Sequence, residues 1–377
     1  MTEQMTSDRH ATWLELFFDL VVVAAVSQLT HLLIHPDGLN VAAFFVLYTA
    51  IWLVWTSFTI YSNVASERTH TRTMLLGMVG LAAMAAAIPE ATGAHSAVFA
   101  AAYLYTCGVA SQGLNRTGRI VKGWSAAQRN AGLLPFIVAF WVGDPHWKLA
   151  LWALGVAMTL CFAMIVDNND TERMREFQER MDRSAERHGR AVPVFQAWDP
   201  HASHLGERLG LFVIIVLGEA VLQLIGAIGE VEWGWSQIGI GLTGFGLLIG
   251  LWWLNFRFGF DEENQTPPRF LLPAHLVVAV SITLVAFGLG AAAEHATDPL
   301  PGLHRWLLCA ALVMCLGLCA LANRAWWGFA IVALPLALAA FGSGLPAVFT
   351  VIALAASVAG FVAYFNRRSA PQEAAAA

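Results

Sequence analysis

Long apolar runs follow one another along almost the whole chain, and they restrict its fold more than any other feature of the sequence. Of the 377 residues, 58% are hydrophobic and only 12% are charged, whereas a soluble domain carries about 25% charged residues. A helix needs about 20 apolar residues to cross a bilayer. The runs are continuous and do not alternate, which argues against membrane strands. The sequence therefore predicts an all-α polytopic membrane protein.

Twelve such segments can be marked, and they predict about 12 transmembrane helices. The fifth is short and the eleventh is broken by proline and glycine, residues that neighbouring helices can accommodate in a membrane. The predicted spans are residues 13–34, 40–61, 73–91, 96–114, 129–143, 147–166, 206–228, 237–258, 270–293, 304–322, 325–342 and 344–365.

Basic residues are distributed unevenly between the loops that these spans would create. With 12 spans and the N-terminus inside, 19 of the 21 Lys and Arg residues fall on the cytoplasmic side, and only Lys148 and Arg305 fall outside. Cytoplasmic loops of membrane proteins carry an excess of Lys and Arg. We therefore expect both termini to be cytoplasmic.

The first span has a second copy later in the chain. Residues 207–226 follow the pattern of span one at a constant offset of 192 positions. The offset predicts that the chain is a duplication, with corresponding polar groups in each half. The aligned polar pairs are Glu15 with Glu207, Ser27 with Glu219, and His31 with Gln223.

The duplication predicts two six-helix halves, separated by a polar segment. Because each half has an even number of spans, both would point the same way, as parallel repeats do. The polar segment carries Glu and Arg at helical spacing, which is typical of a solvated helix. The predicted parts are the N-terminal repeat at residues 1–166, a charged cytoplasmic linker at 167–205, the C-terminal repeat at 206–366 and a disordered tail at 367–377.

Several polar side chains lie inside or beside spans one and seven, where ionisable groups normally face a bundle interior or a water-filled cavity. At about 100° per residue, Glu15 and Asp19 fall on one side of span one, near its cytoplasmic end. Glu219 lies close to the middle of span seven. A carboxylate that gains and loses a proton at that depth suits a proton-coupled carrier or relay. The candidate substrate or ion path comprises Glu15, Asp19, Ser27, His31, His204, Glu207, Glu219 and Gln223.

These residues also have structural interpretations. Glu15 could cap the first helix, Asp19 could pair with a loop arginine, and Glu219 could stay protonated and hydrogen-bond a neighbouring helix. For Glu207 and Arg208 the sequence favours interfacial structure over chemistry. Which interpretation holds depends on contacts that the sequence alone does not give.

Metal, cofactor and enzyme signatures are weak or missing in the sequence. One group before span seven has a spacing that could ligate a metal, although short His and acid clusters are common at membrane entrances: Asp199, His201, His204 and Glu207. There is no G-x-S-x-G, H-E-x-x-H or Walker A pattern, and the five cysteines lie inside apolar runs as packing residues. We expect no enzyme, no catalytic residue, no metal and no cofactor. The expected partners are membrane lipid and a proton or cation with a small solute, but no nucleic acid.

Two stretches of the sequence resemble the bacterial low temperature requirement A family. The first is the ELFFDLV opening at residues 15–21, and the second is the H-x-x-E-R-x-G-L-F-x-I-I-x-L-G-E core from His204 to Glu219. The likeness covers nearly the whole chain, although Ala24 and Ala25 stand where bulkier residues are frequent. The resemblance implies a multi-pass protein of the bacterial cytoplasmic (inner) membrane, and it indicates location better than mechanism.

Two functions from different classes stay open at this point. The first is a secondary transporter or ion-conducting protein with a polar path between helices 1 and 7. The second is a non-transporting membrane scaffold or sensor in cold adaptation. Purified protein in liposomes separates them, because a carrier gives saturable uptake, a channel gives unsaturable current, and a scaffold gives neither.

Site-directed labelling tests the predicted topology. In a variant without the five native cysteines, Ala185→Cys should react with a membrane-impermeant maleimide only after cells are opened. The reason is that the excess of basic residues keeps the linker in the cytoplasm. Glu232→Cys, in the predicted outer loop after span seven, is the matched control and should label in intact cells. Labelling of Ala185→Cys from outside would overturn the topology.

Overall fold

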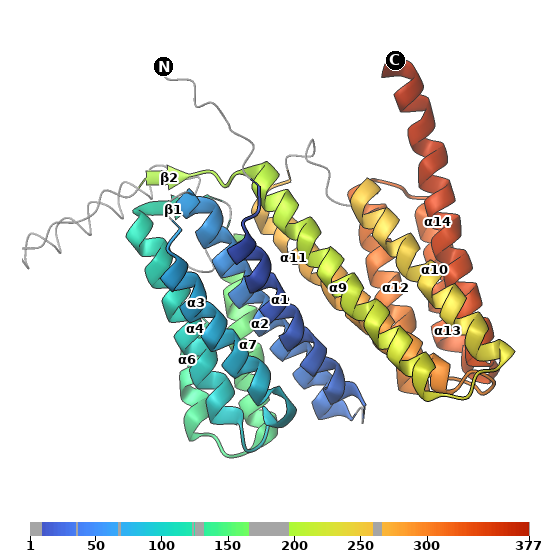
Figure 1. The fold of residues 1–377 in the computed structure, drawn as a ribbon, viewed down its shortest axis with the longest axis horizontal. Helices are drawn as coiled ribbons and strands as arrows, with labels where there is room; N and C mark the ends of the chain where they lie inside the picture. The colour runs from blue at the N-terminus through green and yellow to red at the C-terminus, as the bar shows by residue number, and fades with distance from the viewer. Residues whose placement is uncertain are drawn as a thin grey trace, which may run out of the picture. The chain divides into compact units, whose positions relative to one another are not determined.

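A computed structural model of the chain describes residues 10–34, 37–66, 69–122, 124, 132–165, 196–258 and 266–376. Almost all secondary structure in these residues is helical (Figure 1). Ten of the described helices are long and apolar enough to cross a membrane. The predicted all-α polytopic membrane class is therefore confirmed, and the count of 12 stays a prediction. The long helices are α1 (Trp13–Thr30), α2 (Gly38–Ala65), α3 (Thr71–Ala87), α4 (Ser96–Thr117), α7 (Pro145–Ile165), α9 (Ala202–Glu230), α10 (Trp235–Phe258), α11 (Pro268–Glu294), α12 (Gly302–Ala322) and α14 (Ala347–Ala376).

Two of the predicted spans contain only short helices among the described residues. The fifth holds α6 (Leu133–Val138) and a 3-10 turn that follows it. The α-helix ends at Val138, the turn ends at Trp141, and Val142 is extended. The eleventh holds the 14-residue α13 (Gly328–Phe341). It starts late, because the chain turns at Arg324, whose φ of 49° is left-handed.

The polar segments also differ from their predicted form. Helix α9 begins at Ala202, inside the predicted linker, and Gln196–Trp198 forms strand β2, which pairs in parallel with β1 (Arg119–Val121) (Figure 1). The predicted linker helix lies outside the described residues. Helix α14 runs on to Ala376, whereas the sequence predicted a disordered tail at residues 367–377.

Contacts between residues divide the chain into two compact units, and each is described by itself. The first unit comprises residues 1–209 and 265–273, and the second comprises residues 210–264 and 274–377. The first unit therefore contains α1 to α7, both strands and the first two turns of α9. The second contains the remainder of α9, α10, most of α11, and α12 to α14.

Helix α2 is the centre of the first unit. Every residue from Ala50 to Ala65 is buried, which requires cover on all sides of the helix. Helices α1, α3, α4 and α7 supply this cover (Figure 1). The ring of Phe58 lies 4.9 Å from that of Phe18 on α1. The enclosed stretch includes Trp55 and Asn63, so the polar contacts of these two side chains form away from water.

Aromatic stacking and close backbone approach hold α6 between α4 and α7. The Phe136 ring stacks on Tyr103 of α4 at 4.2 Å and on Trp152 of α7 at 5.7 Å. A Cβ atom on Gly155 of α7 would lie 2.6 Å from the Gly132 carbonyl oxygen and 2.8 Å from the Phe136 ring. Small residues allow such approaches between membrane helices. Because Gly132 meets the middle of α7, α6 covers only the N-terminal half of that helix.

The second unit is a bundle in which α10 packs along α14, and α12 packs against α13 (Figure 1). The Phe212 and His275 rings lie 5.3 Å apart, which joins α9 to α11. The buried Arg305 of α12 donates from Nε to the Ala339 carbonyl at 3.2 Å, near the C-terminal end of α13. Cations are favoured at helix C-termini, so this arginine has a structural role.

Substitution of Gly155 tests the close packing of α6 on α7. Gly155→Ala should lower the free energy of unfolding by about 1–3 kcal/mol, because the added methyl group overlaps the α6 backbone. The matched control is Gly108→Ala on α4, where nothing lies within 4 Å of the new Cβ. The control should be neutral or slightly stabilising. Thermal unfolding in detergent measures both, and equal effects would contradict the described contact.

Candidate functional site

Glu15 is fixed by the first turn of α1. The Thr12 hydroxyl accepts a hydrogen bond from the Glu15 amide at 3.3 Å, and the Thr12 amide donates to Glu15 Oε2 at 2.7 Å. This reciprocal pair is a capping box. The prediction that Glu15 could cap the first helix is confirmed. One carboxylate oxygen is thereby held at the helix start, and the other, Oε1, is directed to α9.

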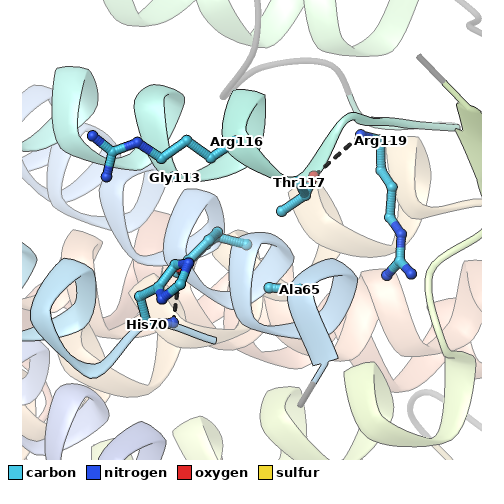
Figure 2. A pocket seen from close by; sticks show the side chains of 7 residues that line it. Ala65, His70, Gly113, Arg116, Thr117 and Arg119 are labelled. Carbon is cyan, nitrogen blue, oxygen red and sulfur yellow. Dashed lines mark hydrogen bonds between the residues drawn. The ribbon is translucent and has the colours of Figure 1, made fainter. Parts of the chain in front are cut away.

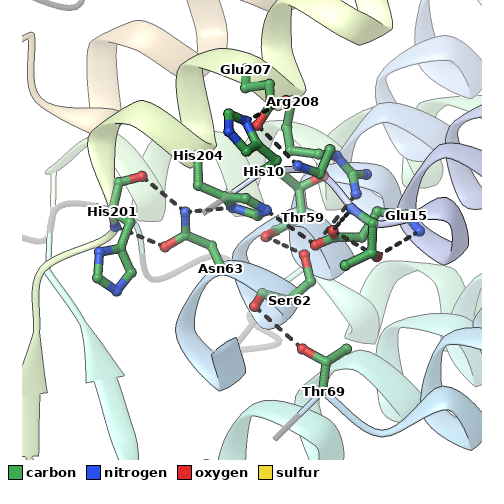
Figure 3. Close-up of polar contacts among 12 residues, drawn as sticks. His10, Glu15, Thr59, Ser62, Asn63, Thr69, His201, His204, Glu207 and Arg208 are labelled. Carbon is green, nitrogen blue, oxygen red and sulfur yellow. Dashed lines mark hydrogen bonds and ion pairs between the residues drawn. The ribbon is translucent and has the colours of Figure 1, made fainter. Parts of the chain in front are cut away.

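Two acidic residues of α1 face two basic residues at the start of α9. Figure 3 shows Glu15 of this group beside His204 and Arg208. His204 Nε2 lies 3.3 Å from Glu15 Oε1, and Arg208 Nη1 lies 3.6 Å from the same oxygen. Arg208 Nη2 donates to Asp19 Oδ1. Each pair is one helical turn apart on its own helix, so these first turns of α9 run beside α1 in the same direction. We call Glu15, Asp19, His204 and Arg208 the buried charge cluster.

The buried charge cluster is closed to solvent. Glu15 is 1% exposed, and Asp19, His204 and Arg208 are 0% exposed. Removing a charge from water costs several kcal/mol unless a partner compensates it. Trp55 of α2 supplies one such contact, because its Nε1 donates to Asp19 Oδ1 at 2.7 Å. The enclosure by α2 therefore makes each contact within the cluster matter more than it would at a surface.

Asn63 of α2 sets the protonation of His204 (Figure 3). Asn63 Oδ1 accepts from the His201 amide at 2.9 Å, which identifies the opposite atom of the side chain as the Nδ2 amide group. Nδ2 donates to the His201 carbonyl at 3.0 Å and contacts His204 Nδ1 at 3.1 Å. A donor at this position requires Nδ1 to be an acceptor. His204 is therefore neutral in this arrangement, with its ring proton on Nε2 beside Glu15.

Charge and hydrogen bonding are both incomplete within the cluster. With His204 neutral, two carboxylates face one permanent cation among the described residues, that of Arg208, which leaves one negative charge in excess. Asp19 Oδ2 and Arg208 Nε are buried and have no hydrogen-bond partner among the described residues. Buried polar groups are normally satisfied, and exceptions mark functional sites or places for water or an ion. The arrangement can therefore take up a proton or a small cation at Asp19.

The expected roles of three neighbouring residues can now be compared with the structure. Glu207 lies at the edge of the cluster, where Oε2 accepts from the Ala11 amide at 2.9 Å and Oε1 lies 3.5 Å from His10 Nδ1. The interfacial position predicted for Arg208 is wrong, because pairing with two carboxylates compensates its burial. Asp19 pairs with this helix arginine, whereas the sequence suggested a loop arginine.

Four other residues of the predicted path lie away from the cluster. On α1, Ser27 is half-buried, and His31 in the following turn is exposed. In the second unit, the half-buried Glu219 accepts from Gln223 Nε2 at 3.1 Å. Nothing lies within 4 Å of a Cβ built on Gly218, so there is open space beside this glycine. A path that joins these residues to the cluster stays a prediction.

Trp55 and Asn63 were missed by the sequence interpretation. A signal for Asn63 existed, since an amide inside an apolar span normally faces a partner. Trp55 gave none, because it stands in a segment rich in aromatic residues. The four residues before span seven whose spacing could ligate a metal have other contacts. Asp199 pairs with Lys122 at 2.8 Å, and His204 contacts Glu15.

A small pocket lies between the C-terminal ends of α2 and α4 and the start of α3 (Figure 2). Its volume is about 70 Å³, and His70, Arg116 and Arg119 are among the residues that line it. The guanidinium group of Arg119 donates to the Val64 carbonyl and lies 3.6 Å from the centre of the Trp198 ring. Arg119 therefore ties the paired strands to α2, which gives it a structural role.

Comparisons with known proteins agree with the described fold class. The family model for bacterial low temperature requirement A protein (LtrA) matches residues 10–366, which include the whole buried charge cluster. The chain is 28% identical over 313 residues to an uncharacterized protein of Rhizobium meliloti (strain 1021), covering 76% of this chain and 71% of that protein. No solved structure matches the chain.

Removal of the Arg208 charge tests the energetic role of the cluster. Arg208→Met should destabilise the protein by about 3–5 kcal/mol, because it leaves buried carboxylates without a permanent cation. The double variant Arg208→Met with Asp19→Asn should recover part of this lost stability. Glu207→Gln is the control at the half-buried edge and should change stability by less than about 1 kcal/mol. If Arg208→Met changed the stability in thermal unfolding as little as Glu207→Gln does, the energetic role of the cluster would be refuted.

Proposed function

The chain belongs to the bacterial low temperature requirement A family, and from this premise we propose that it is a secondary transporter or ion-conducting protein driven by a proton or cation. The observation that supports this proposal is the charge balance of the buried charge cluster. Two carboxylates there face one guanidinium group, and the hydrogen bond from Asn63 keeps His204 neutral. A site with one unbalanced negative charge, closed to water, binds and releases a cation more readily than a balanced ion pair.

Asp19 is the residue at which we place the exchangeable proton. Its Oδ1 already accepts from Trp55 and Arg208, whereas Oδ2 has no partner among the described residues. A proton on Oδ2 therefore breaks no hydrogen bond. It also removes the charge that holds Arg208, whose Nη1 lies 3.6 Å from Glu15 Oε1. Protonation of Asp19 then favours Glu15 as the partner of Arg208.

This exchange of partners links proton binding to helix contact. Arg208 belongs to α9, and both carboxylates belong to α1, one helical turn apart. When Arg208 moves from Asp19 to Glu15, the contact between the starts of the two helices changes with it. A carrier needs such a link between the occupied state of a site and the arrangement of its helices.

A polar path between helices 1 and 7 completes the proposal. It would run past Ser27 and His31 on one side and past Glu219 and Gln223 on the other. Support comes from the aligned positions of these residues in the two halves and from the open space beside Gly218. The proposal includes no enzymatic reaction.

Location and topology belong to the same proposal. We place the chain in the bacterial cytoplasmic (inner) membrane, with both termini in the cytoplasm. The support is the distribution of the 21 Lys and Arg residues, because 19 of them fall on the predicted cytoplasmic side. The offset of 192 positions between the two polar spans supports two parallel six-helix repeats.

Flux through purified protein in liposomes tests the function. With a pH-sensitive dye inside and candidate cations and solutes outside, we expect uptake or current that depends on pH. Asp19→Asn should keep the fold, because the amide is of the same size and still accepts from Trp55, and it should abolish the pH dependence. Glu207→Gln is the control and should behave as wild type. Absence of flux for every solute and cation would support a scaffold or sensor and contradict the proposal.

Glu219 is tested separately, because its partner is Gln223 rather than the cluster. If it binds the transported proton or cation, Glu219→Gln should remove the pH dependence without loss of folded protein. If it is structural, Glu219→Gln should be nearly silent, and Glu219→Leu should lower stability by about 1–3 kcal/mol. Normal pH-dependent flux in Glu219→Gln would exclude it from the path and leave Asp19 as the site.

A further inference from the structure

Lys148 is one of the two basic residues that fall outside the predicted cytoplasmic set, and its charge lacks an acidic partner among the described residues. Within the part of the chain that the structure describes, the ammonium group donates only to Ser96 Oγ, at 2.7 Å. Asp144, one helical turn earlier, is engaged elsewhere, because its Oδ1 accepts from the amides of His146 and Trp147 at 2.9 and 3.1 Å. A half-buried ammonium with one neutral partner is incompletely compensated.

Lys148 lines a small pocket between α4, α7 and the 3-10 turn that follows α6. The pocket has a volume of about 30 Å³, and none of the residues that line it is acidic. Trp152 also lines it, one helical turn after Lys148 on α7. This indole is 0% exposed, and its Nε1 has no hydrogen-bond partner among the described residues. A buried N–H group without an acceptor costs about 1–3 kcal/mol, so an occupant that accepts from it would be stabilising.

Ser96 adds two further features that favour a negative charge. It is the first residue of the 22-residue helix α4, and helix N-termini attract anions. Its hydroxyl oxygen accepts from Lys148, which leaves the hydroxyl hydrogen free to donate. Three residues that line one pocket thus carry donor groups: the ammonium group of Lys148, the hydroxyl group of Ser96 and the indole N–H of Trp152.

We propose that this pocket binds a small monovalent anion of the halide class, on the side of the membrane opposite the linker. Water is the competing occupant, and a pocket must offer about 10–15 Å³ to hold one molecule. Water also has to donate, however, and the side chains that border this pocket offer donors. A halide only accepts. The size of the pocket excludes phosphate and organic acids, and the bound anion would neutralise Lys148 and fasten the outer ends of α4 and α7.

Thermal unfolding of the full chain in detergent tests the site, with sodium bromide replacing sodium gluconate at constant ionic strength. The melting temperature should rise with bromide and saturate, because a ligand that binds only the folded state stabilises it by mass action. Lys148→Met should abolish this dependence. Lys122→Met, which removes a surface lysine paired with Asp199, is the matched control and should keep it.

Trp152→Phe provides a second variant that retains the ammonium group and the aromatic stacking. Loss of one hydrogen bond should raise the half-saturating bromide concentration about tenfold. Crystals grown with bromide should show an anomalous scattering peak beside Lys148 and Ser96. A melting temperature that does not depend on bromide, or that responds equally in Lys148→Met, would overturn the proposal in favour of water.

Discussion

The pairing of Arg208 with Glu15 and Asp19 is the interaction on which the first unit depends most. All three side chains are closed to solvent, so each would be costly without the others. The pairing joins the start of α9 to α1, while Trp55 and Asn63 join both helices to α2, the enclosed helix of the unit. Three helices thus meet at one set of charges. Any rearrangement of α1 against α9 has to pass through these contacts.

The cluster is not a balanced ion pair. Its excess negative charge is what distinguishes it from a purely structural site. Replacing balanced buried ion pairs by apolar residues is often neutral or stabilising, and such pairs say little about function. Here the Asn63 amide holds His204 neutral, one carboxylate is left in excess, and Asp19 Oδ2 is unsatisfied among the described residues. A partly satisfied polar network in a dry interior is costly to keep. Its retention is explained if a proton or cation enters and leaves it.

The anion pocket proposed at the other end of the unit is also inferred from an uncompensated charge. That charge is positive there, whereas it is negative at the cluster. No acidic side chain lines that pocket, whereas at the cluster one carboxylate oxygen, Asp19 Oδ2, lacks a donor among the described residues. Each site is identified by what its buried groups lack. The two sites lie at opposite ends of α2, α4 and α7, so an effect of halide on flux would report on coupling along these helices.

The sequence predicted those features that depend on local pattern. Apolar runs located the long helices, and the position of Glu15 at the start of the first span predicted its capping role. It also singled out Asp19 and His204 as polar groups within or beside apolar spans. The partner of Asp19 could not be predicted, because Arg208 reaches it across a large separation in sequence, and a lone arginine at a span end normally faces the interface. The roles of Trp55 and Asn63 likewise depend on tertiary packing, and α6 is short because it packs on only half of α7.

Infrared difference spectroscopy of the purified protein in lipid tests the central claim most directly. The claim is that a carboxyl group of the buried charge cluster exchanges a proton while the fold stays intact. Between acidic and alkaline pH, the account predicts a carbonyl stretch of a protonated carboxylic acid that disappears on titration. This band should be missing in Asp19→Asn and retained in Glu207→Gln. An identical titrating band in wild type and Asp19→Asn, or none in either, would contradict the account.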